Sequence, residues 1–171
     1  MAEAVHIRPE TPADSAVIGA LTEAAFRDAP YSDGSEAAIV ERLRQSETMI
    51  PSLVAVDEDG GIMGHVAFSP VTIESGEKGW YGLGPISVWP QLQRRGIGSA
   101  LIVDGLRRLE GIGARGCVLI GDPAFYARFG FASDPELTYR GLPTRNVQRL
   151  VFMPPVPKGE ITYHAAFEAA A

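Results

Sequence analysis

From residue 88 to residue 110 the chain reads VWPQLQRRGIGSALIVDGLRRLE. The first residues are typical of a strand, and the later ones have the apolar spacing of an amphipathic helix. Two adjacent arginines, Arg94 and Arg95, and two glycines, Gly96 and Gly98, lie between them. Because the whole chain carries a formal net charge of -6, this strand-to-helix junction is a local basic spot on an acidic protein.

The junction has the features of an anion site. The first N–H groups of a helix have no partner within the helix, and the helix dipole adds partial positive charge there. The glycines let an anion approach these N–H groups closely, and arginine side chains suit a phosphate. The spacing therefore predicts a pyrophosphate cradle. The alternative is a plain strand-to-helix turn with solvent-facing arginines, which a short Gly-x-Gly does not exclude.

Other phosphate-binding motifs do not fit this chain. No Gly-Lys-Ser or Gly-Lys-Thr is present, which excludes a Walker loop. A literal Gly-x-Gly-x-x-Gly runs from Gly111 to Gly116, but it follows a predicted helix and precedes a predicted strand, the reverse of the dinucleotide-binding context. We interpret it as a helix end and a loop. Cys117 is the only cysteine, so no internal disulfide can form, and its thiol is predicted to lie in the core.

Length and composition point to one soluble domain. The 171 residues favour a single domain over 1–171, with a core of about 5–153 and a C-terminal extension carrying an extra strand at 160–167. The N-terminus lacks a signal peptide, and no apolar run approaches the roughly 20 residues that span a bilayer. The negative charge argues against attraction to nucleic acid. We expect a cytoplasmic protein without nucleic-acid or membrane partners.

Strands and helices alternate along the chain, but three strands follow one another in its middle. This order argues for a mixed sheet with helices on its faces and against a purely parallel Rossmann sheet. Strands are expected within 5–9, 52–71 (two, around a turn at 57–61), 79–90, 116–122, 145–154 and 160–167. Helices are expected within 11–26, 36–46, the second half of 88–110, and 123–130.

Three segments together carry a family resemblance. QRRGIGSAL (93–101) matches the Gln/Arg-x-x-Gly-x-Gly/Ala loop of the GNAT superfamily of acetyl-CoA-dependent N-acetyltransferases. GLGPISVWP (82–90) looks like that family's central strand, and FYARFGF (125–131) resembles its late Tyr-x-x-x-Gly-Phe motif, as in the subset with GDPxFYxRFGF. The resemblance covers roughly residues 5–153. It implies an α/β fold with a central, mostly antiparallel mixed sheet of about six to seven strands and helices on both faces.

The resemblance implies acetyl-CoA as the acetyl donor and no metal. In the family, backbone N–H groups of the loop hold the pyrophosphate, and the central strand pairs with the pantetheine arm. A bulge in that strand exposes an N–H that polarises the thioester carbonyl, and Gly84-Pro85 is where we expect it, with a kinked edge as the alternative. The cofactor-binding residues implied are Ile86, Ser87, Val88, Gln93, Arg94, Arg95, Gly96, Ile97, Gly98, Ser99 and Ala100.

Tyr126 matches the family tyrosine that protonates the departing CoA thiolate. A phenol can serve as this general acid, although the residue could instead be a core tyrosine on a short helix. Many relatives carry an Asn-x-x-Ala stretch before the tyrosine, and LIGDPAFY (119–126) departs from it. Asp122 is expected to cap the helix, with Pro123 at its first position.

The acceptor side is harder to read. His65 is a candidate general base because the ordinary pKa of histidine suits that role, while a packed strand histidine is the alternative. The loop 26–36 corresponds to the segment that often shapes the acceptor site in relatives. Its carboxylates Asp28, Asp33 and Glu36 could attract a cationic amine, or could be solvated turn residues.

These features favour a transferase, namely an N-acetyltransferase that moves acetyl from acetyl-CoA to a primary amine by direct nucleophilic attack. The acceptor class left open is a small molecule or a peptide. The alternative is a non-catalytic acyl-CoA-binding sensor on the same fold. A homodimer is compatible with the resemblance.

Overall fold

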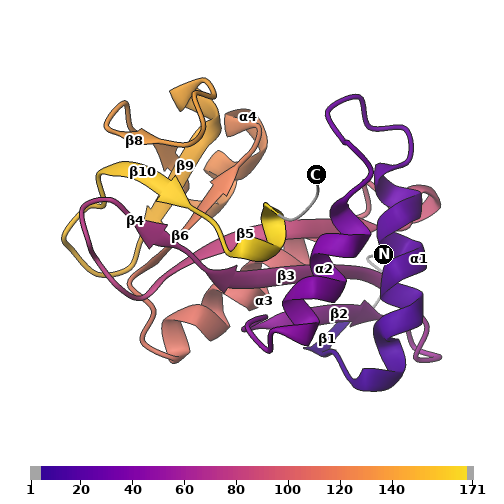
Figure 1. The fold of residues 1–171 in the computed structure, drawn as a ribbon. Coiled ribbons are helices and arrows are strands. Elements are labelled where there is room, and N and C mark those ends of the chain that lie inside the picture. Colours follow the sequence, from indigo (N-terminus) through magenta and orange to yellow (C-terminus); the bar gives the residue numbers. More distant parts are fainter. Residues whose placement is uncertain (1–4, 169–171) are drawn as a thin grey trace.

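The computed structural model describes residues 5–168 (Figure 1). Within this range the chain forms a seven-stranded sheet in the order β1-β2-β3-β5-β6-β9-β7. Its β5–β6 pairing is parallel and its other pairings are antiparallel, which confirms the mostly antiparallel mixed sheet. The strands are β1 (His6–Pro9), β2 (Ser52–Val56), β3 (Ile62–Pro70), β5 (Trp80–Val88), β6 (Gly116–Ile120), β7 (Ala132–Ser133) and β9 (Val147–Val151).

Helices lie on both faces of this sheet (Figure 1). Successive strand residues point to opposite faces. On β2, Leu53 packs in the cluster that includes α3, whereas Val54 packs with Ile18 of α1 and Val40 of α2. No helix in the described part of the chain is long and apolar enough to cross a bilayer. The helices are α1 (Ser15–Phe26), α2 (Glu36–Gln45), α3 (Ile97–Gly111) and α4 (Pro123–Tyr126).

The first helix begins where the sequence predicts. Thr11 is the N-cap, and its N–H donates to the Asp14 carboxylate at 2.7 Å in a capping box. Pro12–Asp14 form a 3-10 turn before α1 starts, whereas the sequence predicted a single helix from this point on. Arg8 lies 2.8 Å from Asp14, and this hydrogen bond lowers the pKa of the carboxyl to about 2. The cap thus ties the start of α1 to β1.

Three short strands from the middle and the later part of the chain form a second sheet in the order β4-β10-β8, within residues 5–168. The strand expected over 160–167 is shorter, because the His164 side chain accepts from the Ala166 N–H and caps a 3-10 turn at Ala165–Phe167. Ile161 and Tyr163 pack on Trp80 of the large sheet. The strands are β4 (Thr72–Ile73), β8 (Leu137–Thr138) and β10 (Gly159–Thr162).

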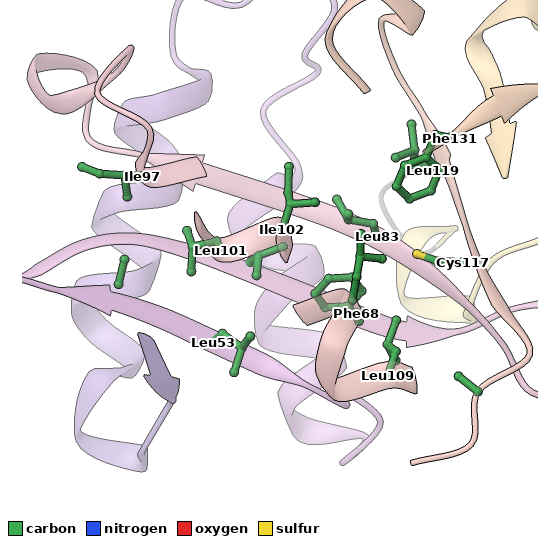
Figure 2. Packing of buried hydrophobic residues seen from close by; sticks show 14 of the residues in the cluster. Leu53, Phe68, Leu83, Ile97, Leu101, Ile102, Leu109, Cys117, Leu119 and Phe131 are labelled. Carbon is green, nitrogen blue, oxygen red and sulfur yellow. The ribbon is translucent and has the colours of Figure 1, made fainter. Parts of the chain in front are cut away.

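The main core fixes α3 against the sheet. Figure 2 shows Leu101, Ile102 and Leu109 of α3 among Leu53, Phe68 and Leu83 of the strands. A Cβ at Gly105 would lie 2.3 Å from the Phe68 ring, so the helix approaches the sheet closely at this glycine. Cys117 lies fully buried in the same cluster, as predicted. This packing holds the N-terminus of α3 beside the end of β5.

Candidate active site

The site starts from a local break in β5. Val66 of β3 lies opposite Ile86 of β5, and Phe68 lies opposite Leu83, so β5 carries one extra residue between these pairs. The extra residue falls at the predicted Gly84-Pro85, where Gly84 has a φ of 140°. This confirms the predicted bulge, since proline cannot donate to a ladder and glycine tolerates positive φ.

Beyond this point β5 and β6 separate. Their described pairing runs over Trp80–Gly82 opposite Gly116–Val118, and no register pair is formed between β5 and β6 from Leu83 to Val88. One edge of β5 therefore faces a gap in the sheet. Among the described residues, this edge lines a cavity of about 940 Å³. The other walls are the end of α1 and the loop after it, the end of β6, α4 and the segment 142–146.

Gln93 lines this cavity, and the two glycines of the loop follow it in the chain. Gly96 is the N-cap of α3 with a φ of 83°, which a glycine adopts without strain. A Cβ at Gly98 would meet its nearest described atoms, in Ile86 and Val88, only at 3.9 Å. Packing within the protein therefore leaves room for a Cβ at position 98. The N-terminus of α3 is where the sequence predicts an anion site, and that assignment stays a prediction.

The other loop residues differ in how they can contribute. The Gln93 side chain lines the cavity and donates to the Val88 carbonyl at 3.1 Å. Arg94 and Arg95 are exposed. Ile97 is buried in the core, so it presents its backbone alone. Ser99 and Ala100 follow in the first turn and are partly buried. The assignment of all these loop residues to the binding of acetyl-CoA stays a prediction.

Tyr126, at the end of α4, also lines the cavity. Asp122 Oδ1 accepts from the Ala124 N–H at 2.9 Å, and Pro123 occupies the first turn, which confirms the predicted cap. The Tyr126 ring packs edge-on against Phe125, with 4.9 Å between centroids. Burial raises the pKa of Tyr126 to about 12, so the phenol carries its proton at neutral pH.

Two polar residues that the sequence did not single out form hydrogen bonds to the segment just before α4, the helix of Tyr126. Asn146 and Gln148 donate to the Gly121 carbonyl at 3.1 and 3.0 Å. Gln148 is almost fully buried on β9. A glutamine in a strand is visible in the sequence, but its partner, 27 residues away, is not readable from it.

Comparison with known proteins agrees with this geometry. The model of the acetyltransferase (GNAT) domain matches residues 51–133. The Escherichia coli protein YhbS, named an uncharacterized N-acetyltransferase, is 38% identical over 125 residues, covering 73% of this chain and 72% of YhbS. The chain belongs to the GNAT family of acetyltransferases.

Two solved GNAT structures resemble the whole of this acetyltransferase. A GNAT family acetyltransferase from Brucella melitensis, in complex with acetyl-CoA, is 49% identical with a TM-score of 0.85 and covers 96% of this chain and 99% of its own. The E. coli YhbS structure, in complex with CoA, is 31% identical with a TM-score of 0.84 and covers 100% of this chain and 96% of its own. The expected GNAT fold is confirmed.

His65 of this acetyltransferase is fully buried on β3 and is absent from the described lining of the cavity. Its Nε2 lies 2.8 Å from Ser52 Oγ and 3.5 Å from Glu10 Oε1. Burial lowers the pKa of His65 despite the neighbouring carboxylate. Burial alone would raise the pKa of Glu10, but hydrogen bonds from His65, Arg44 and Ser52 outweigh it and hold the pKa at about 2. In this arrangement His65 has no direct access to an acceptor amine in the described cavity.

On the acceptor side of this GNAT protein, the loop carboxylates follow the second of the two expectations, that of turn residues. Phe26 and Tyr31 line the cavity, but the three loop carboxylates are absent from its described walls. Asp33 accepts from the Ser35 N–H, and Glu36 accepts from the Ser32 hydroxyl, as turn residues do. Leu142 and Arg145 line the cavity instead, from a segment whose place in space the sequence order did not reveal. Within residues 5–168, no group of three or more His, Cys, Asp or Glu side chains could hold a metal ion.

Proposed function

We propose that this GNAT acetyltransferase moves the acetyl group of acetyl-CoA to a primary amine by direct attack of the amine nitrogen on the thioester. One observation carries the proposal. The unpaired edge of β5, Gln93 just before α3, and Tyr126 line one cavity. The Brucella relative, 49% identical, was solved with acetyl-CoA.

The loop and α3 are proposed to hold the pyrophosphate. The open space at Gly98 supports this assignment, because a phosphate needs close access to the backbone N–H groups of the first helical turn. Arg94 and Arg95 are exposed at the same junction and add positive charge to an otherwise acidic protein.

The β5 edge is proposed to bind the pantetheine arm and to polarise the thioester carbonyl. A peptide-like arm can complete the hydrogen bonding of an unpaired strand edge. The bulge at Gly84-Pro85 turns the local backbone away from the regular ladder, so an N–H beside it is available to a developing oxyanion.

Tyr126 is proposed to protonate the leaving thiolate. A phenol with a pKa of about 12 is a weaker acid than a thiol, whose ordinary pKa is about 8.5, so a free tyrosinate would be an unfavourable product. The transfer is therefore concerted with the return of a proton to Tyr126 from the nitrogen of the tetrahedral intermediate. In this scheme Tyr126 shuttles a proton and ends each cycle protonated.

The acceptor is proposed to enter between the loop after α1 and the segment 142–146. Phe26, Tyr31 and Leu142 give this end of the cavity an apolar and aromatic character. Arg145 adds a cation that has no hydrogen bond or ion pair to another residue among those described. These features favour a small-molecule or peptide amine that carries an apolar group and a negative charge.

The test combines binding and turnover. Acetyl-CoA binding is measured by calorimetry, and CoA release is measured against a panel of amines that includes amino acids, polyamines and short peptides. We expect turnover with at least one amine, and a fall in kcat of about 100-fold or more in Tyr126→Phe with unchanged acetyl-CoA affinity. Tight binding without turnover on any amine, together with no effect of Tyr126→Phe on any readout, would instead indicate an acyl-CoA sensor.

A further inference from the structure

Direct attack requires the acceptor to lose a proton, because an ammonium nitrogen has no free electron pair. Histidine is the side chain whose ordinary pKa suits this task. The described walls of the cavity contain no histidine. His65, however, lies on β3, the strand next to β5 in the sheet. Its register partner on β5 is Ser87, which lines the cavity.

The side chains of His65 and Ser87 project to the same face of the sheet. Facing residues of an antiparallel pair share a face, with Cβ atoms about 4.5–5.5 Å apart. Ile86 and Val88 approach Gly98 of α3, so Ser87, between them, points to the other face. That is the face of α1, from which Phe26 enters the cavity wall.

Both side chains hold a buried polar atom without a hydrogen-bond partner in the described part of the chain. These atoms are His65 Nδ1 and Ser87 Oγ. Buried polar groups are normally paired, so two such atoms on register partners of neighbouring strands call for an explanation. His65 Nε2 is directed at Ser52 and Glu10, which suits the tautomer with the proton on Nε2. Nδ1 is then an acceptor, and the Ser87 hydroxyl is a donor.

We propose that Ser87 and His65 form a proton relay that takes the proton of the acceptor ammonium out of the cavity, with Ser52 and Glu10 at its far end. The inference rests on the proposed acetyl transfer and adds to it the residues that deprotonate the acceptor. Rotation of the Ser87 side chain or one bridging water closes the Ser87–His65 contact. In the relay, rotation of the Ser87 side chain brings its Oγ, which is buried in this structure, to the acceptor, and His65 acts through Ser87.

Each turnover moves one proton through the relay. Ser87 Oγ takes a proton from the ammonium while its own proton passes to His65 Nδ1. The resulting imidazolium faces Glu10, whose carboxylate lies 3.5 Å from Nε2. The Nε2 proton then leaves through Ser52 and Glu10, whose side chain reaches the surface with 12% exposure. The turnover leaves His65 with its proton on Nδ1, so the ring returns to the Nε2 tautomer by proton exchange with water while the cavity is open, before the next turnover. Acetylation of an ammonium releases one proton overall, and this path delivers it to solvent.

The charges around His65 favour a neutral resting ring that can accept a proton. Glu10, at the end of β1, and Arg44, on α2, are the charged groups that act on it in the described structure. Arg44 lies 2.7 Å from Glu10 and keeps that carboxylate ionised. Burial lowers the pKa of His65, and the carboxylate of Glu10 raises it, so Glu10 offsets part of the effect of burial on this pKa. Ser52 of β2 and Ser87 of β5 complete the polar surroundings without adding charge.

The experiment compares Ser87→Ala with a matched control, Ser69→Ala. Ser69 is also a fully buried serine whose hydroxyl has no partner among the described residues, but it does not line the described cavity. For the best amine of the panel, kcat/KM is measured from pH 6 to pH 10. We expect Ser87→Ala to lose on the order of 100-fold at pH 7 and to recover above the pKa of the amine, where free amine is abundant. Ser87→Thr, which keeps the hydroxyl, is expected to restore most of the activity, and Ser69→Ala to behave as the unmodified enzyme.

A second variant guards against misfolding. His65→Gln is expected to give the same change in pH profile, and the double variant with Ser87→Ala to lose no more than either alone, because both act in one path. A wild-type pH profile in Ser87→Ala, a loss that is equal at every pH, or additive losses in the double variant would overturn the relay. Absence of turnover in the unmodified enzyme would instead overturn the proposed acetyl transfer.

Discussion

The ring of Tyr126 lies over the bare backbone of Gly121, so closely that a Cβ at Gly121 would be 2.6 Å from Tyr126 Cε2. Position 121 therefore excludes any side chain while the ring keeps this place. Asn146 and Gln148 hold the Gly121 carbonyl from the neighbouring segment. The candidate acid is thus positioned by a glycine five residues before it, and not only by its own helix.

Gly121→Ala is expected to displace the Tyr126 ring and to lower kcat by about 10- to 100-fold, because small misplacements of a reacting group are costly. The affinity for acetyl-CoA should change little, since the loop at α3 is untouched. Stopped-flow measurement of CoA release and calorimetric binding separate the two effects. Gly19→Ala on α1 is the control, because a Cβ there meets no described atom within 4 Å. An unchanged kcat in Gly121→Ala would show that the ring position does not matter.

Gly98→Val is expected to raise the Kd for acetyl-CoA by about 10-fold or more, because a side chain over the first turn of α3 blocks the phosphate. The fold should tolerate it, since the nearest atoms to a Cβ lie 3.9 Å away. Gly111→Val, at the other end of the same helix and equally uncrowded among the described residues, provides the control. If both variants bind acetyl-CoA as the unmodified protein does, the pyrophosphate lies elsewhere.

Arg145→Gln is expected to raise KM about fivefold for acceptors that carry a carboxylate, which corresponds to the roughly 1 kcal/mol of a solvent-exposed charge pair. The KM for amines without a carboxylate should stay the same. Arg107→Gln removes the same charge from an exposed site outside the described cavity wall and serves as the comparison. An equal change for both classes of acceptor would contradict a charge contact at position 145.

Asp14→Asn is expected to destabilise the protein at pH 7 and less so in acid. The Arg8 hydrogen bond lowers the folded-state pKa of Asp14 to about 2, from an ordinary 3.8, so its stabilisation is fully present above pH 3.8 and is lost as the pH falls towards 2. A lost cap costs about 1 kcal/mol, or about 2–4 °C in Tm for a protein of this size. Thermal unfolding at pH 7 and at pH 3 measures the difference.

The control variant is Asp104→Asn, which removes the ion pair of Asp104 with Arg108 on α3 and should shift Tm less at pH 7. A Tm difference for Asp14→Asn that stays constant between the two pH values would contradict the linkage.

Local signals explain which parts of the fold were predictable. Helix caps at Thr11 and Asp122 depend on residues two or three positions away, so the sequence alone locates them. The bulge at Gly84-Pro85 follows from the missing proline N–H. The Gly111–Gly116 motif also forms the end of α3 and the loop before β6, as its position between a helix and a strand indicated.

The contacts that the sequence did not reveal join distant segments. Glu10 and His65 are 55 positions apart, and nothing in either segment announces their contact. The pairing of His65 with Ser87 depends on the register of two strands on the far side of the bulge. Arg145 reaches the cavity because of the path of the chain between β8 and β9. Register and loop path are set by the packing of the whole sheet, which no short pattern encodes.

The short pairing of β5 with β6 has a mechanical consequence. In the described sheet, β1, β2, β3 and β5 form one side, β6, β9 and β7 form the other, and three register pairs join them. On the proposed binding mode, acetyl-CoA bridges the two sides where the backbone does not. Bound acetyl-CoA would then connect the two parts of the sheet. The relative motion of these parts is expected to decrease when acetyl-CoA binds and to increase when CoA leaves.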